Sequence, residues 1–450
     1  QTFLVGRRAG ISLQRELGAV CRGNIGLALH VITRHVDFMR GQRIDQIIHA
    51  QDRVRRVFTF RKTRHQFLER IKRVARGLGI ALAVVIGLGL LATIYALRIR
   101  TGMADFAVNR LAGERLGAGE ALYRTSDGHY MFKYLPPAAL IYVPLAALPL
   151  PVAGGVWFAL SLAALAGMFA LSDRLVPHRN ARYVLLLSGL ILTKYFLHEL
   201  RLGQTNALVT FVMLASLGAL SASGVRPELK AGTLAGVAIG LKPYAALIVP
   251  YFIVTGRWRS LTACLATLLV LAAIPTFFYG IEGNLALLRQ WAVTLSQSTP
   301  TLLTNNDNVS VVAFFTKWLG DPARALVPTG LVLGLLALLT LVVIALGRGP
   351  GSAVLEGALI LTLIPLVSPL GWDYTFLMSL LAVVLVVNHF QAFPWPTRAL
   401  LAANFTLIAL AIYDVMGRQA YATYMQWSVT TLNFIGVIAA LAYLRLKQVC

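Results

Sequence analysis

Ionisable and amide side chains are few in this sequence, and several stand where a long apolar stretch ends or breaks. Asp105 follows one such stretch, Lys242 divides another, and the polar runs RLGQTN, NNDNVS and GWDY begin at residues 201, 305 and 371. A carboxylate can accept a proton, and a cation held where water is scarce can bind an anion. Polar groups at membrane depth are costly and usually mark function. These side chains are therefore the candidates for chemistry, and the apolar elements around them must position them.

The composition indicates that those elements are membrane helices. Of the 450 residues, 57% are hydrophobic and 13% are charged, whereas a soluble chain is about 45–50% apolar and about 25% charged. Only helices or closed barrels satisfy their backbone groups in lipid, and apolar stretches of helix length predict an all-α polytopic membrane protein. The cysteines Cys21, Cys264 and Cys450 are too far apart for zinc-ligand spacing or a disulfide framework.

Stretches long enough to cross a membrane lie at 78–97, 152–171, 183–200, 205–222, 260–279, 325–346, 353–369, 374–390, 397–415 and 425–444. Two irregular segments are interpreted from the tendency of short Lys/Arg-rich loops to stay in the cytoplasm. With the basic loops inside, the proline-rich segment 136–150 is predicted to be a helix at the outer face. By the same reasoning, 231–254 is predicted to form two short crossings that turn at Lys242-Pro243. The result is about twelve crossings with both termini inside.

In this topology the polar clusters gather on one side of a cytoplasmic (inner) membrane. The outer loops are 98–135, 201–204, 242–243, 280–324, 370–373 and 416–424. Together they hold Asp105, Lys242 and the three polar runs, which a plain helix bundle has no reason to collect on one face. We therefore expect a transmembrane domain over 78–444 with an active site at its periplasmic or extracellular face. Its catalytic loops would be 98–135, 280–324 and 370–373.

The ends of the chain differ from this domain. Residues 1–77 carry 17 Lys+Arg against 5 Asp+Glu, so they predict a basic cytoplasmic extension at the headgroups of anionic lipids. Because the chain begins with Gln1 and shows no signal-peptide pattern, a fragment or a misplaced start is the other interpretation. Nucleic-acid binding is the rival use of such charge, but no binding motif accompanies it, so we expect no nucleic-acid partner. Residues 445–450 are predicted to form a cytoplasmic tail.

A series of motifs resembles glycosyltransferase family 87, whose members use polyprenol-phosphate sugars. The first outer loop contains Asp105-Phe106, then Gly119-x-x-Leu122-Tyr123, then Phe132-Lys133-Tyr134-x-Pro136-Pro137. The sequences GQTN at 203–206, Lys242-Pro243, GRWR at 256–259 and SPLGWD at 368–373 follow in the same order. Each motif is weak alone, but their ordered series over about residues 78–444 is more specific.

The resemblance implies a GT-C architecture and transfer of a hexose, most often mannose, from a polyprenyl-phosphate carrier to a lipid or glycan acceptor. Membrane lipids would be the other partners, and no cofactor, nucleotide sugar or metal would be needed. It implies that Asp105 takes the proton from the acceptor hydroxyl. The alternative is that Asp105 caps a helix over 106–117.

The resemblance also suggests which residues hold the substrates. Lys242, Arg201 and Lys133 are candidates for the donor phosphate, although Lys242 could instead extend to the interface and Arg201 could join helices. The candidate pocket residues are Gln204, Asn206, Asn308, Trp372, Asp373 and Tyr374. For Gln204 and Asn206 the alternative is helix-to-helix hydrogen bonding, and for Asn308 it is capping of the segment 309–319.

One position departs from the family pattern. Members commonly carry a histidine at or just after the tryptophan that aligns with Trp372, whereas this chain has Asp373-Tyr374. Aspartate can act as a base and tyrosine can donate to a phosphate oxygen, and His129 or His198 could substitute for the missing histidine. A family member without activity is therefore one alternative. A transporter or flippase is another, although it predicts charges within the spans and two matched halves.

Overall fold

The computed structural model describes residues 89–176, 181–347 and 352–448, together with residues 55, 72 and 85–87. Residues Leu91–Cys450 form one compact unit. The predicted extension 1–77 and most of the first predicted span lie outside the described residues. The described part consists of helices and loops, and its one β-type pairing is an isolated antiparallel bridge between Asn308 and Trp372. The predicted all-α class is therefore confirmed.

The first half of the unit contains η1 (Tyr95–Ile99), α4 (Ala104–Gly117), η2 (Thr125–Tyr130), η3 (Pro136–Tyr142), α5 (Val143–Ala146), α6 (Leu150–Leu175), α7 (Ala181–Leu202), α8 (Asn206–Leu220), α9 (Val225–Leu241), η4 (Pro243–Leu247) and α10 (Ile248–Val254). The second half contains α11 (Trp258–Ala273), α12 (Thr276–Ser298), η5 (Pro300–Leu302), α13 (Val311–Leu319), α14 (Pro322–Ala345), α15 (Ser352–Val367), η6 (Asp373–Ser379), α16 (Leu380–Asn388), η7 (Phe390–Ala392), α17 (Trp395–Leu410), α18 (Tyr413–Met416), α19 (Arg418–Gln426) and α20 (Val429–Leu446).

The lengths of these helices divide the predicted spans into two groups. Among the described residues, four helices are long and apolar enough to cross a membrane: Leu150–Leu175, Tyr183–Leu202, Pro322–Ala345 and Val429–Leu446. Counting each of two bent helix pairs as one span raises the number to six. Other predicted spans fall on shorter apolar helices, such as α8 and α15. The count of about twelve crossings stays a prediction.

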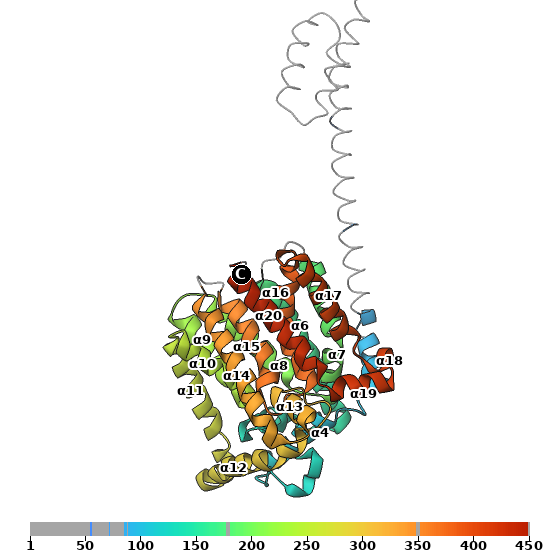
Figure 1. Ribbon diagram of the computed structural model, residues 1–450. Helices are drawn as coiled ribbons and strands as arrows, with labels where there is room; N and C mark the ends of the chain where they lie inside the picture. The colour runs from blue at the N-terminus through green and yellow to red at the C-terminus, as the bar shows by residue number, and fades with distance from the viewer. Residues whose placement is uncertain are drawn as a thin grey trace, which may run out of the picture. The chain divides into compact units, whose positions relative to one another are not determined.

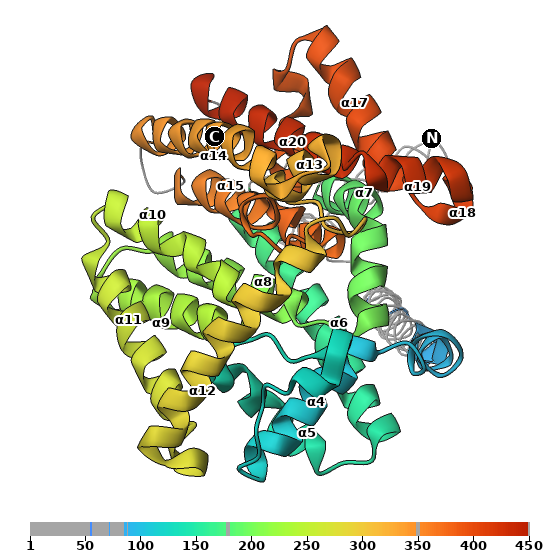
Figure 2. The same ribbon diagram turned by 60° about the horizontal axis from the view of Figure 1, so that its bottom comes forward.

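Helix α12 lies across one end of the unit. The apolar helix α11 ends at Ala273, and the axis of α12 turns from it by 101°. Figures 1 and 2 show α12 at the end that also holds α4 and α13, whereas α20 terminates at the opposite end. Phe277 and Ile281 of α12 are exposed apolar side chains. Much of the predicted outer loop 280–324 is thus helical, and α12 forms one wall of the cleft described below.

Lys242 stands at the tip of a helical hairpin. Its backbone is extended (φ −144°, ψ 113°) because Pro243 disfavours helical geometry in the residue before it, so α9 ends at Leu241. The start of α9 is tied to the start of α11, since Ser260 Oγ of α11 donates to Glu228 O of α9 at 2.9 Å. Gly232 lets α11 approach α9, because a Cβ there would lie 2.0 Å from Ser260 O. The predicted turn at Lys242-Pro243 is confirmed.

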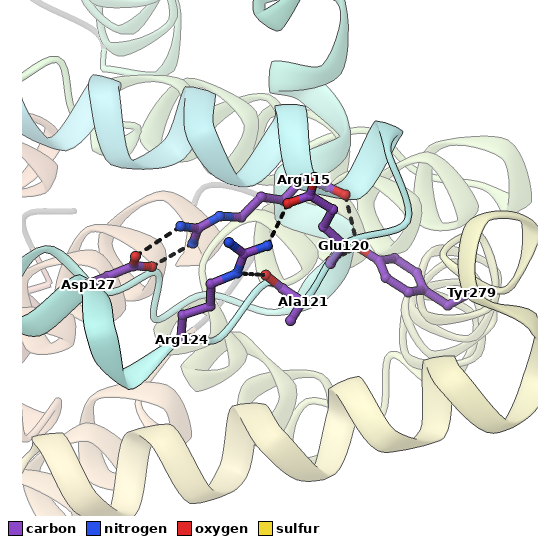
Figure 3. Close-up of polar contacts among 6 residues, drawn as sticks. All are labelled: Arg115, Glu120, Ala121, Arg124, Asp127 and Tyr279. Atoms are coloured by element: carbon purple, nitrogen blue, oxygen red, sulfur yellow. Dashed lines mark hydrogen bonds and ion pairs between the residues drawn. The ribbon is translucent and has the colours of Figure 1, made fainter.

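The loop between α4 and η3 is held by an ion pair and by α12 (Figure 3). The Arg115 guanidinium binds both carboxylate oxygens of Asp127, at 2.5 and 2.9 Å. Tyr279 of α12 donates to Glu120 O at 2.7 Å, and Trp291 of α12 donates to Lys133 O at 3.1 Å. These contacts fix the path of the chain up to Lys133, which lines the cleft.

We predict that Asp127→Asn lowers the stability of the unit, because it breaks a bidentate charged pair whose side chains are only 9% and 16% exposed. The expected loss is about 1–3 kcal/mol, measured as thermal unfolding in detergent. Hydrogen bonds from Arg115 lower the pKa of Asp127 below 3.8. Asp127 binds its proton less readily in the folded protein, so this stabilisation is complete above about pH 4 and is lost as the pH falls further.

The control is Glu120→Gln, which breaks the exposed ion pair between Glu120 and Arg124. Exposed pairs contribute about 0–1 kcal/mol, so a much smaller change is expected. Equal losses of thermal stability in the two variants would contradict the role of the Arg115–Asp127 ion pair in holding the loop between α4 and η3.

Candidate active site

A cleft of about 780 Å³ opens beside Lys242. Its walls come from the end of the loop before η3, from η4, from the end of α12 with η5, and from the end of α15 with Trp372. The apolar lining includes Leu247, Leu295, Leu303, Ile364, Val367 and Leu370. The cationic lining residues are Lys133 and Lys242. The cleft therefore combines an apolar surface with two ammonium groups, which suits an amphipathic anion.

Lys242 is almost fully buried, with 3% of its surface exposed. Its Nζ donates to Gln204 Oε1 at 2.7 Å and to Asn206 Oδ1 at 2.8 Å, and it lies 4.8 Å from the centre of the Tyr134 ring. No carboxylate of the described residues lies within ion-pair distance of it. An ammonium has three protons, so one remains for a ligand in the cleft. Interfacial snorkelling does not describe so buried a group.

Asp105 lies in the first turn of α4, where the helix dipole favours a negative charge. The residue before the helix is Met103, and no side chain caps this end. The capping alternative for Asp105 is therefore wrong. Instead, Asp105 Oδ2 accepts a hydrogen bond from Gln204 Nε2 at 2.6 Å. Gln204 thus has Asp105 on its nitrogen and Lys242 on its oxygen, so one amide joins the carboxylate to the ammonium.

Gly203 allows this approach. Its φ of +68° is one that side-chain-bearing residues rarely adopt, and a Cβ there would lie 2.6 Å from Phe106 Cβ. Trp157 Nε1 also donates to Gly203 O at 2.8 Å. The glycine therefore lets the α7–α8 turn pack directly on the start of α4, which brings Gln204 to Asp105.

Sequence reasoning missed Glu199, which completes this network on the other side of Lys242. It lies near the end of α7 and is fully buried. Its two oxygens accept from Asn206 Nδ2 at 2.6 Å and from Ala207 N at 2.8 Å. Tyr244, also missed, donates to Asn206 Oδ1. The available signal was a carboxylate inside the apolar stretch 183–200, where charge is costly.

The loop 305–310 is joined to the segment 369–373. Asn308 pairs with Trp372 in the isolated bridge, and its Nδ2 donates to Pro369 O at 2.9 Å. Asp373 N donates to Asp307 O at 3.0 Å. Ser310, rather than Asn308, caps α13 by accepting from Ala313 N at 3.2 Å. The capping alternative for Asn308 is therefore wrong, and its contacts hold the two segments together.

Beside the cleft, Asp373 and Tyr374 meet His198 of α7. His198 Nδ1 lies 3.4 Å from Asp373 Oδ1, and the imidazole ring meets the Tyr374 ring edge-on at 5.1 Å. Tyr374 OH in turn accepts from Gln204 Nε2 at 3.1 Å. The side chain of His129 lies outside the described part of the chain. Burial, together with the nearby Asp373, raises the pKa of the half-buried Asp307.

The other two predicted cations differ in exposure. Arg201 is exposed, and its side chain makes no hydrogen bond or ion pair with another described residue. Lys133 is half-buried and lines the cleft. Burial lowers the pKa of Lys133, and the charge of Asp105 opposes that effect. Among the described side chains, no group of three or more His, Cys, Asp or Glu could hold a metal ion.

Apart from Arg201, the predicted site residues thus form one continuous assembly with two parts. Lys133, Lys242 and Trp372 line the cleft itself. Asp105, Gln204, Asn206 and Tyr374 are joined to Lys242 directly or through shared hydrogen bonds, and Asn308 and Asp373 support Trp372. The structure therefore places Asp105 and Lys242 on opposite ends of one glutamine.

Helices of membrane-spanning length enclose a buried ammonium beside an apolar cleft, and together they indicate a membrane protein. The sequence profile of glycosyltransferase family 87 matches residues 132–369, more than half of the chain, and the chain belongs to this family. It is a membrane glycosyltransferase.

A curated relative agrees with this assignment. The chain is 29% identical over 316 residues to the polyprenol-phosphate-mannose-dependent alpha-(1-2)-phosphatidylinositol pentamannoside mannosyltransferase of Mycolicibacterium smegmatis. The match covers 65% of this chain and 71% of the relative. No solved structure matches the chain.

We predict that Lys317→Met frees the loop that carries Asp307 and Asn308. The Lys317 ammonium donates to Asn306 O at 2.9 Å, to Asn308 O at 2.7 Å and to Ser428 Oγ at 3.0 Å. Removing the donor leaves these acceptors unpaired, so amide hydrogen exchange across 305–310 should rise about tenfold or more. The control is Arg324→Met on the exposed start of α14. Unchanged exchange in the Lys317 variant would contradict the role of Lys317 in fixing this loop.

Proposed function

We propose that this enzyme transfers mannose from a polyprenyl-phosphate carrier to a lipid or glycan acceptor. The observation that carries the proposal is the shared glutamine, which sets a carboxylate and a buried ammonium on its two ends. One group suits the attacking hydroxyl and the other suits the departing phosphate. The activity for which the mycobacterial relative is named supports this choice of donor and of sugar.

The cleft beside Lys242 is the proposed donor site. A polyprenyl chain would lie on the apolar wall formed by α12, η4 and the end of α15. Its phosphate would meet Lys242, which has a proton not engaged by the two amides, and Lys133, which also lines the cleft. Cations already fixed where negative charge develops stabilise the transition state without further reorganisation. Trp372, also in the lining, would pack against the sugar.

Asp105 is the proposed base. The acceptor oxygen attacks the anomeric carbon while the bond from that carbon to the phosphate oxygen breaks and the phosphate keeps the electron pair. The hydroxyl proton passes to Asp105. A carboxylate on the side of the sugar opposite the leaving group is the arrangement that inversion requires. Asp105 does not line the cleft, so the acceptor would approach from the α4 and α7 side of Gln204.

That acceptor side carries the remaining polar candidates. Arg201 is exposed there and lies beside Gly102, since a Cβ added to Gly102 would stand 3.6 Å from Arg201 Cγ. His198 with Asp373 forms an imidazole–carboxylate pair that could serve as the second acid or base in place of the family histidine. Tyr374 lies between this pair and Gln204. Asn206 and Asn308 are proposed to position their neighbours, because they are fully buried.

The proposed location is a cytoplasmic (inner) membrane, with the cleft at its periplasmic or extracellular face. The basic loops predicted to lie inside support this orientation, and so does the shared end of α4, α12 and α13. Residues 78–444 would be the catalytic transmembrane domain. Residues 1–77 would be a basic cytoplasmic extension, and 445–450 a cytoplasmic tail.

The decisive measurement is transfer of radiolabelled mannose from synthetic polyprenyl-phosphomannose by protein in lipid nanodiscs. We expect Asp105→Asn to reduce turnover by about 10²–10⁴-fold, the usual contribution of a general base, while polyprenyl phosphate still binds. The control is Glu114→Gln, an exposed carboxylate two turns along α4. Equal turnover in wild type and Asp105→Asn would remove Asp105 from the mechanism. No transfer by the wild type with any polyprenyl donor would contradict the proposed function.

We predict opposite accessibility for two exposed positions, Asn306 in the loop before α13 and Lys230 in the second turn of α9. In a cysteine-free background, a membrane-impermeant maleimide should label Asn306→Cys in intact cells. It should label Lys230→Cys only after permeabilisation. This follows because short basic loops stay inside. Labelling of both positions in intact cells, or of Lys230→Cys alone, would contradict the proposed orientation.

A further inference from the structure

We infer that Glu199 is a positioning residue, which acts through Asn206 to hold Lys242 with its free proton toward the cleft. The inference deepens the proposed function and rests on it, because it assigns Lys242 to the donor phosphate. Glu199 lies outside the cleft lining and does not contact Lys242 directly. Glu199 therefore reaches Lys242 through the Asn206 amide and through the field of its charge across that amide.

The hydrogen-bond pattern around Asn206 admits one orientation of its amide. An ionised carboxylate only accepts, so Glu199 requires Asn206 to turn its Nδ2 toward it, at 2.6 Å. The oxygen of the same amide then faces the other way. It accepts from Lys242 Nζ at 2.8 Å and from Tyr244 OH. Glu199 thus fixes the Asn206 amide so that its oxygen, and not its NH₂ group, faces Lys242.

Lys242 is consequently held between two matched arms. On one side Asp105 orients the Gln204 amide, and on the other Glu199 orients the Asn206 amide. Each amide presents its oxygen to the ammonium, at 2.7 and 2.8 Å. Two protons are fixed by these arms, and the third is directed by tetrahedral geometry. Preorganisation of this kind is what a phosphate-binding cation needs.

The position requires a carboxylate and not merely a polar group. Glu199 receives two donors, Asn206 Nδ2 and Ala207 N, and a carboxylate has an acceptor for each. In Glu199→Gln the side chain has one acceptor oxygen for these two donors. Either one donor would face the new NH₂ group, or the Asn206 amide would flip and present its own NH₂ group to Lys242. A fully buried negative charge is costly unless a cation compensates it. Lys242, one amide away, is the cation available.

The test is a double-mutant cycle of Glu199→Gln and Lys242→Met in nanodiscs. Glu199→Gln alone should weaken polyprenyl-phosphate binding and raise the donor KM about tenfold, the scale of a lost charged hydrogen bond. The acceptor KM should change little. In the Lys242→Met background, Glu199→Gln should have no further effect on the donor, because its route is gone. Additive losses would overturn the inference and leave a purely structural role.

Two further variants separate positioning from folding. Glu199→Gln with Asn206→Asp exchanges the carboxylate and the amide, which restores an acceptor for Ala207 N and for Lys242. Thermal stability should therefore recover over Glu199→Gln. Donor binding should stay at least severalfold weaker than in the wild type, because the carboxylate now contacts Lys242 directly and competes with the phosphate. Glu356→Gln removes another buried carboxylate, which is paired with Arg445 at 3.2 Å, and should lower thermal stability without raising the donor KM. Donor binding by the exchanged pair as tight as that of the wild type would count against the inference.

A measurement without substrate distinguishes a failure of the positioning role of Glu199 from a failure of the proposed function. Acetylation of Lys242 by acetic anhydride, followed by peptide mass spectrometry, should speed up severalfold in Glu199→Gln, because the ammonium loses one of its arms. Lys133, which also lines the cleft, serves as the internal reference, and its acetylation rate should not change. An unchanged Lys242 rate would overturn the role of Glu199. If Lys242 acetylation is faster in Glu199→Gln but the wild type does not bind polyprenyl phosphate, only the proposed function is overturned.

Discussion

The buried ammonium of Lys242 is the constraint around which the site is organised. A charge with 3% of its surface exposed must exchange its water for fixed acceptors, and the protein supplies two amide oxygens instead of a carboxylate. A direct ion pair would have neutralised the lysine and competed with any anionic ligand. Amide oxygens satisfy two protons and leave the net charge available to the cleft. The carboxylates stand one residue farther out, at Asp105 and Glu199.

Three backbone features make this arrangement possible, and each departs from a continuous helix. Pro243 stops α9 so that Lys242 sits at the tip of a hairpin. Gly203 lets the α7–α8 turn reach the start of α4. The bridge between Asn308 and Trp372 joins two loops that are distant in the sequence. These irregular points lie between helices, and the polar side chains are concentrated at them, as expected where polar groups must be kept out of lipid.

Hydropathy and loop charge were enough to predict the all-α class, the break at Lys242 and the gathering of Asp105, Lys242 and Gln204. These properties depend on patterns that are local in the sequence. Partnership between side chains is not local, which is why Glu199 escaped notice and why Asp105 and Asn308 could be mistaken for caps. The true partner of each lies on another segment, 99 residues away for Asp105 and Gln204 and 61 residues away for Asn308 and Pro369.

In the proposed mechanism, the position of Gln204 also separates the two substrates. Lys133 and Lys242 face the apolar cleft, whereas Asp105 and the His198–Asp373 pair lie outside its lining. A lipid-linked donor needs apolar surface and cations, and a hydroxyl acceptor needs a base that is not already neutralised. Had the carboxylate faced the cleft, it would have repelled the phosphate and paired with the lysines. An uncharged side chain that contacts both groups keeps base and cation close without letting them cancel, and this separation explains why an amide stands between them.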